Sequence, residues 1–141
     1  GMTPEHTNAD LLRAVYEGVA LAIRDCYAAV GAPMHEIRLS GGGARSRIWG
    51  QIIADVTGVT VVVPKGSEFG TRGAALLAGV GIRWFDSIVE AAAATVQIDR
   101  VYTPDSTLKP LYDETYAVYI ALRHALRPVW QQSAARKLLS D

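Results

Sequence analysis

The sequence predicts an α/β fold in which a short parallel sheet layer is covered by helices. Three observations predict it: helical and extended patterns alternate, a glycine triplet separates a strand-like run from a helix-like run, and a β-branched run follows. With 141 residues, half of them hydrophobic, the chain is long enough for one domain core. Its 14 basic and 14 acidic residues balance, which argues against nucleic acid or an acidic membrane surface as partner.

Apolar residues recur at helical spacing over residues 8–30 and predict a long helix with a wide buried stripe. The stripe comprises Leu11, Leu12, Val15, Val19, Ile23, Cys26, Tyr27 and Val30. Cys26, the one cysteine, is therefore expected to be a buried, inert thiol, with no disulfide in the chain. Gly18 inside a helix costs about 1 kcal/mol relative to alanine, so we expect another backbone to approach closely there. Gly31 is expected to cap the helix.

A short strand is predicted at residues 36–39, where apolar and polar residues alternate. After the glycines, helical spacing returns in Ile48, Ile52, Ile53 and Val56, and Gly58 closes that helix. The run "VTVVVP" at residues 59–64 is typical of a strand buried on both faces of a parallel sheet.

The second half of the chain is predicted to be mostly helical. Residues 68–81, rich in alanine and glycine, predict a tightly packed helix, and Ser87 with Glu90 predicts a capping box that opens the next one. Residues 96–110 are interpreted as a loop because proline and other turn residues punctuate them. A final amphipathic helix is expected to reach about Pro128, with a weaker helical signal beyond it. Its apolar positions include Tyr112, Tyr116, Tyr119, Ile120 and Leu126.

The stretch "GGGARS" at residues 41–46 is the candidate binding loop. A loop from the carboxyl end of a parallel strand into a helix presents free backbone N–H groups to an anion, and glycines let a ligand approach the main chain. A tight turn with Ser46 as helix N-cap explains the pattern equally well. A dinucleotide fingerprint fails, because Ser46 replaces its third glycine and the next strand ends in Val63, Pro64 and Lys65 without an acid. A phosphate-binding P-loop fails because "GGGARS" lacks its lysine.

These residues resemble the adenosine-binding segment of the FGGY carbohydrate kinases, in which "GGGARS" is followed by Trp49, Gln51 and "ADV" at residues 54–56. "DLLRAVYEG" at residues 10–18 resembles the closing half of the family's C-terminal signature. "GTRGAALLAGVG" and "RVYTPD" resemble the family's later segments. The resemblance implies a partial actin-like (ribonuclease H-like) ATPase domain. Residues 1–141 would be the C-terminal portion of the second, nucleotide-binding domain, and the N-terminal sugar-binding domain would lie outside this chain.

The resemblance also implies a function: transfer of the γ-phosphoryl group of ATP, with Mg²⁺, to a hydroxyl of a sugar or polyol, with a pentulose-like substrate favoured. Gly41, Gly42 and Gly43 would lie along the phosphates and ribose of ATP or ADP, with the Gly42 N–H on the α-phosphate. Ser46 matches the position on the adenine side. Membership would further imply a possible homodimer.

No catalytic or metal-binding residue is assigned in the chain. The family's general-base aspartate lies in a segment that nothing here resembles, and three other aspartates are interpreted as surface or capping residues: Asp55, Asp86 and Asp105. Three basic residues near the loop are interpreted as solvated surface: Arg45, Arg47 and Lys65. The histidines lack metal-ligand spacing and are interpreted as structural or surface residues: His6, His35 and His124.

Apolar runs are shorter than a membrane span and the N-terminal residues do not read as a signal peptide, so a cytoplasmic protein without a membrane partner is expected. The alternative to an enzyme fragment is a non-catalytic module that binds nucleotide or mediates dimerisation.

Overall fold

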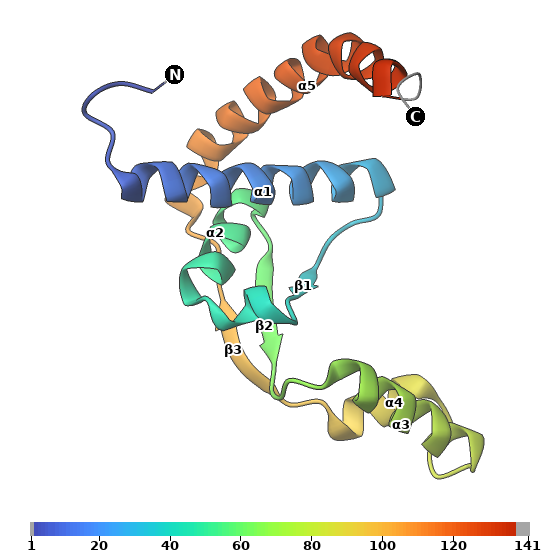
Figure 1. Cartoon of the computed structure of the whole chain (residues 1–141). Helices are drawn as coiled ribbons and strands as arrows, with labels where there is room; N and C mark the ends of the chain where they lie inside the picture. Colours follow the sequence, from blue (N-terminus) through green and yellow to red (C-terminus); the bar gives the residue numbers. More distant parts are fainter. Residues whose placement is uncertain (1, 138–141) are drawn as a thin grey trace.

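The computed structural model describes residues 2–137 (Figure 1). Along the chain the elements are α1 (Asn8–Val30), β1 (Glu36–Arg38), the 3₁₀ turn η1 (Gly42–Arg45), α2 (Arg47–Thr57), β2 (Thr60–Pro64), α3 (Phe69–Gly81), α4 (Ile88–Thr95), β3 (Ile98–Tyr102), the 3₁₀ turn η2 (Ser106–Leu108) and α5 (Lys109–Lys137). Helices and strands alternate as expected for an α/β chain.

The three strands form one sheet in the order β1-β2-β3. β1 and β2 are parallel, with Ile37 opposite Val61, which confirms the parallel prediction for the first two strands. β2, whose Val61 is fully buried, is covered on both faces.

β3 corrects the prediction of a loop at residues 96–110. It pairs antiparallel with β2, with Val62 opposite Val101. The turn residues Pro104 and Asp105 follow the strand instead of interrupting it, so they mark its end. β3 lies at the sheet edge and is mostly exposed, which weakens the alternation by which a strand is recognised in a sequence.

Helix termini follow the local sequence signals. Gly31 and Gly58 end α1 and α2 in the left-handed conformation, each with φ 70°, as predicted. At the start of α4, the Ser87 hydroxyl accepts from Glu90 N, but the Glu90 carboxylate accepts from Asp86 N, so only half of the expected capping box forms.

The core lies where α1 crosses α2 above the sheet (Figure 1). Its buried members come from α1, β1, α2, β2 and the start of α5: Ala20, Leu21, Ile37, Ile52, Ile53, Ala54, Val56, Val61 and Tyr112. This core fixes α2 over β1 and β2, and thereby fixes the loop that joins β1 to α2.

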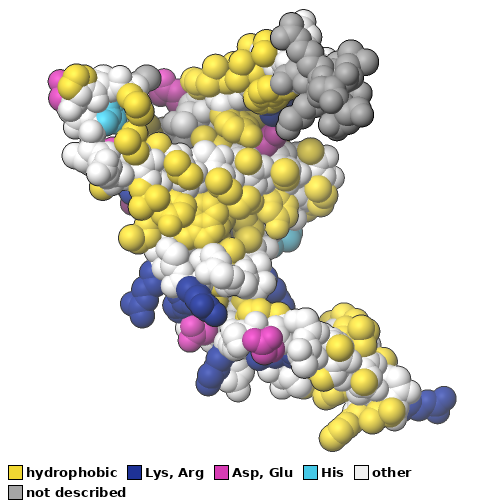
Figure 2. Space-filling model, in the orientation of Figure 1, with side chains coloured by type: hydrophobic (Ala, Val, Ile, Leu, Met, Phe, Trp, Pro, Cys, Tyr) yellow, Lys and Arg dark blue, Asp and Glu magenta, His cyan; other side chains and the backbone are white. Residues whose placement is uncertain are grey.

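The burial expected for α1 is wrong in three respects. Leu12, Val15 and Val19 are 57%, 62% and 48% exposed, and Cys26 is exposed. A Cβ built on Gly18 would meet no heavy atom within 4 Å, so no backbone approaches it. The reason is that α1 buries only a narrow face, centred on Ala20 and Leu21, while apolar side chains remain visible along the helix (Figure 2).

α3 forms as predicted but is not tightly packed. It pairs with α4 away from the core (Figure 1), and Gly79 is its only buried residue. At Gly79, an added Cβ would lie 3.1 Å from the ring of Phe85, so this glycine makes room for the connection between α3 and α4.

α5 continues through Pro128 to Lys137, beyond the predicted end. Proline removes one helical hydrogen bond, but glutamine, alanine, arginine and lysine follow it, and these residues favour helix. Residues 138–141, at the end of the segment with the weaker helical signal, lie outside the described residues.

Candidate functional site

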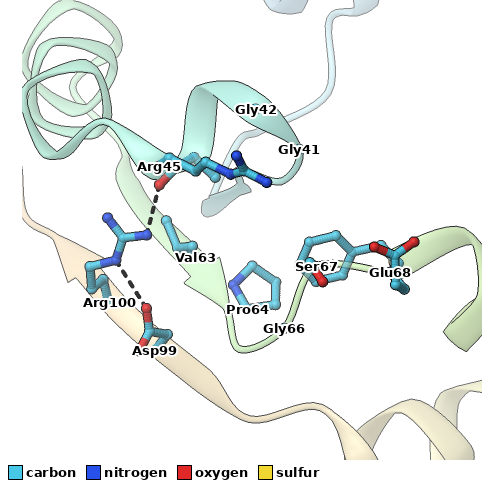
Figure 3. Close-up of a pocket in the computed structure, with 12 residues that line it drawn as sticks. Gly41, Gly42, Arg45, Val63, Pro64, Gly66, Ser67, Glu68, Asp99 and Arg100 are labelled. Carbon is cyan, nitrogen blue, oxygen red and sulfur yellow. Dashed lines mark hydrogen bonds and ion pairs between the residues drawn. The ribbon is translucent and has the colours of Figure 1, made fainter.

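A pocket of roughly 290 Å³ opens at the carboxyl ends of β1 and β2 (Figure 3). Parallel strands bring the loops that follow them to one edge of the sheet, so the turn after β1 faces the loop after β2. β3 contributes the remaining wall. The lining residues are Gly41, Gly42, Ala44, Arg45, Val63, Pro64, Gly66, Ser67, Glu68, Phe69, Asp99 and Arg100.

The first wall is the glycine turn. Gly41 has φ 79° and ψ −160°, a backbone conformation that favours glycine. The turn's first hydrogen bond runs from Ala44 N to Gly41 O at 3.2 Å, so the N–H groups of Gly42 and Gly43 precede the first donor of the turn. A Cβ on Gly41 or Gly42 would meet no atom within 4 Å, which leaves the backbone there open to a ligand.

The four sequence-predicted site residues divide into two pairs. Gly41 and Gly42 line the pocket, whereas Gly43 and Ser46 are not among its lining residues. A Cβ on Gly43 would come within 3.0 Å of the Trp49 indole nitrogen, so Gly43 admits that ring. Ser46 is the N-cap of α2, and its hydroxyl accepts from Trp49 N at 3.2 Å.

Arg100, on β3, joins the third wall to the first. Its Nη2 donates to the carbonyl oxygen of Ala44 at 2.7 Å and its Nε to Asp99 Oδ2 at 3.0 Å (Figure 3). Its Nη1 donates to the Tyr102 hydroxyl at 3.0 Å. The hydrogen bond to Asp99 raises the pKa of Arg100 above its ordinary value, and the Arg100 side chain is only partly exposed. Sequence reasoning missed Arg100 and Asp99 because it treated their segment as a loop.

The loop after β2 forms the second wall. Gly66 has φ 114°, and a Cβ there would lie 2.5 Å from Arg72 Nη2. Arg72, from α3, donates to the carbonyl oxygen of Lys65 at 2.8 Å and lies over the Phe69 ring. The sequence carried a signal for this wall: two predicted parallel strands place both following loops at the same edge.

Arg45 lines the pocket, whereas Arg47 and Lys65 are exposed outside its lining. Of the three aspartates interpreted above as surface or capping residues, Asp86 is exposed as expected. Asp55 is buried, not on a polar surface, and its Oδ1 accepts from Asp105 N at 2.9 Å and Gln51 Nε2 at 2.8 Å. Asp55 thus ties α2 to the segment after β3. Asp105 caps η2 as expected.

Within residues 2–137, no group of three or more histidine, cysteine or acidic residues could hold a metal ion. In the same part of the chain, no helix combines the length and the apolar character needed to cross a bilayer.

Comparison with known proteins adds the family. Residues 1–82 match the C-terminal domain of the FGGY family of carbohydrate kinases. The xylulose kinase of Staphylococcus epidermidis is 37% identical over 86% of this chain and 25% of its own, and the erythritol kinase of Brucella abortus is 33% identical over 97% and 27%. The chain therefore spans about a quarter of the length of these curated relatives.

Solved structures agree. The xylulose kinase of Rhodospirillum rubrum superposes with a TM-score of 0.82 and 32% identity, over 93% of this chain and 27% of that one. The glycerol kinase of Plasmodium falciparum, at 24% identity and TM-score 0.73, supports the fold alone, over 87% of this chain and 26% of its own. The expected partial actin-like ATPase fold is confirmed. Because the family model covers more than half of the chain and the fold agrees over 93% of it, this chain belongs to the FGGY family of carbohydrate kinases.

Proposed function

We propose that this chain supplies the adenine-nucleotide half-site of an ATP-dependent kinase that phosphorylates a hydroxyl of a sugar or polyol. In this proposal residues 1–141 are the C-terminal portion of the second, nucleotide-binding domain. The observation that carries it is the open backbone of Gly41 and Gly42 at the mouth of a pocket, in a chain of a carbohydrate kinase family. Free N–H groups and nearby arginines are suited to phosphate.

The phosphates would lie along Gly41 and Gly42, with the Gly42 N–H on the α-phosphate. Arg45 and Arg100 line the same pocket and contribute positive charge. Ser46 accepts from Trp49 N through its oxygen, and a hydroxyl can still donate its proton, so it keeps the proposed role on the adenine side. Gly43 would contribute its N–H, and its lack of a side chain leaves room for the Trp49 ring.

Magnesium would arrive with the nucleotide. Mg²⁺ in phosphoryl-transfer sites keeps several waters and uses substrate phosphates with one or two carboxylates. The pocket offers Glu68 and Asp99, and Asp99 is already paired with Arg100 at 3.0 Å, so the residues of this chain fit a phosphate-borne ion better than a protein cage. Bound there, the ion would neutralise charge on the phosphates.

The substrate is proposed as a pentulose-like sugar or polyol. Relatives include kinases named for xylulose, erythritol and autoinducer-2, so the range extends beyond pentuloses. No catalytic base is proposed within this chain. Its residues would hold and orient the nucleotide, and positioning supplies much of the rate enhancement in phosphoryl transfer.

The exposed side of α1 supports the proposed placement within a larger domain. Leu12, Val15 and Val19 are exposed, and apolar side chains gather along this part of the surface (Figure 2), which a free-standing protein would ordinarily bury. The chain aligns with about a quarter of the length of its relatives, which agrees with this placement.

The test is an amide-resolved NMR titration of the chain with MgADP, with NADH as the control ligand. Saturable shifts confined to residues 41–46 and the facing loop at 66–69 are expected. If a folded sample shows no shift in either loop at millimolar MgADP, the nucleotide assignment is wrong. Loss of the response without Mg²⁺ would support the phosphate-borne ion.

A second candidate is a non-catalytic module that dimerises, and the apolar surface of α1 favours it. Sedimentation equilibrium separates the two proposals. A dimer that Val15→Glu dissociates, in a chain that does not bind MgADP, would favour the module.

A further inference from the structure

We infer that Arg100 is a positioning residue for the nucleotide site, an inference that rests on the proposed function. It holds the glycine turn in its binding shape through the carbonyl group of Ala44, across 56 residues of sequence. Arg100 lies on β3, which is far from the glycine turn in the sequence.

Ala44 is the one buried residue of the turn, 6% exposed, and its carbonyl lies where η1 gives way to α2. The backbone hydrogen bonds around this junction run from Ser46 N to Gly43 O and from Gly50 N to Ser46 O, and Arg100 Nη2 supplies the donor for Ala44 O at 2.7 Å. A buried carbonyl without a donor is unfavourable, so this charge-assisted bond selects one orientation of the Ala44–Arg45 peptide.

The turn needs such a restraint because three successive glycines have more backbone freedom than any other residues. In the proposed site, the N–H group of Gly42 is presented to the ligand by the 3₁₀ shape of the turn. A turn that is already ordered loses less freedom when a ligand binds, and therefore binds it more tightly.

Arg100 is itself held in place. Its Nε and Nη1 are engaged by Asp99 and by the Tyr102 hydroxyl, and the Tyr102 ring lies directly beneath Gly50 of α2. Three of the five guanidinium donors are thus aimed at partners on β3 and on the turn. A lysine ammonium could not span these directions, since its donors radiate from a single nitrogen.

The experiment compares Arg100→Gln, Arg100→Lys and the matched control Arg38→Gln by MgADP titration and by backbone ¹⁵N relaxation without nucleotide. Arg38 is the fitting control because it lies on β1 of the same sheet and pairs with Glu36 of its own strand at 2.9 Å, outside the pocket. Both Arg100 variants should raise the Kd for MgADP by about tenfold and lower the order parameters of residues 42–45. Arg38→Gln should change neither.

Wild-type affinity in Arg100→Lys would show that only charge matters and would overturn the inference, as would unchanged order parameters in Arg100→Gln. If Arg100→Gln does not fold, Tyr102→Phe carries the test: it keeps the ring beneath Gly50 and removes one Arg100 partner, so a smaller change in the same direction is expected. Failure of the wild-type chain to bind MgADP would overturn the proposed function instead, while relaxation of the turn still judges whether Arg100 orders it.

Discussion

Glycine-to-alanine substitutions in two helices should have opposite effects on stability. Gly18 in α1 and Gly50 in α2 are both interior helical positions, and neither has a positive φ. Alanine is favoured over glycine there by about 1 kcal/mol. A Cβ on Gly18 meets nothing within 4 Å, so Gly18→Ala should raise the free energy of unfolding by roughly 0.5–1 kcal/mol.

At Gly50 the same Cβ would lie 2.4–2.8 Å from three carbons of the Tyr102 ring. Overpacking of this kind costs about 1–3 kcal/mol, so after the helix gain Gly50→Ala should lose about 1 kcal/mol net. The two variants should therefore differ by about 2 kcal/mol, or several degrees in Tm.

Urea unfolding followed by circular dichroism measures both effects. A double-mutant cycle isolates the cause, because in a Tyr102→Ala background the ring is gone and Gly50→Ala should become stabilising, like Gly18→Ala. The packing argument is refuted if Gly50→Ala stabilises the chain that retains Tyr102.

Three further outcomes are expected. Gly42→Val should leave unfolding within about 0.5 kcal/mol of the wild type, since its Cβ enters open space, yet weaken MgADP binding; equal affinity in the NMR titration would contradict the phosphate position. Arg24→Gln should lower the free energy of unfolding in urea by about 2 kcal/mol, because Arg24 donates to Val56 O and to Asp113 and lies over the Tyr116 ring. A loss below about 0.5 kcal/mol would contradict this prediction. Hydrogen bonds from Lys109 and then Arg24 hold the pKa of Asp113 below the ordinary 3.8. The stabilising effect of this carboxylate is therefore complete above about pH 4 and is lost as pH falls through its folded pKa. In urea unfolding between about pH 2 and 6, the stability of Asp113→Asn should be less sensitive to acid than that of the wild type.

Periodicity predicted the elements of this fold better than their surroundings. The 3.6-residue spacing in α1 and the β-branched run in β2 identify helix and strand because those patterns are local. Burial depends on what covers a face, and spacing carries no information about that. Leu12 and Val15 have the spacing of a buried stripe but are exposed. Asp55 has the position of a polar surface residue but is buried, and its carboxylate accepts a hydrogen bond from Asp105 N.

The candidate site divides along the same line. Gly41 and Gly42 belong to one contiguous motif, and Gly41 has a backbone conformation that favours glycine, so the sequence could point to them. Arg100 reaches the turn only because β3 pairs antiparallel with β2, and that pairing is a long-range contact. A local motif can thus specify which backbone N–H groups a ligand would meet, but the restraint that keeps them in place comes from an edge strand the sequence did not reveal. Mutations in β3 should for that reason alter nucleotide binding without touching the glycine motif.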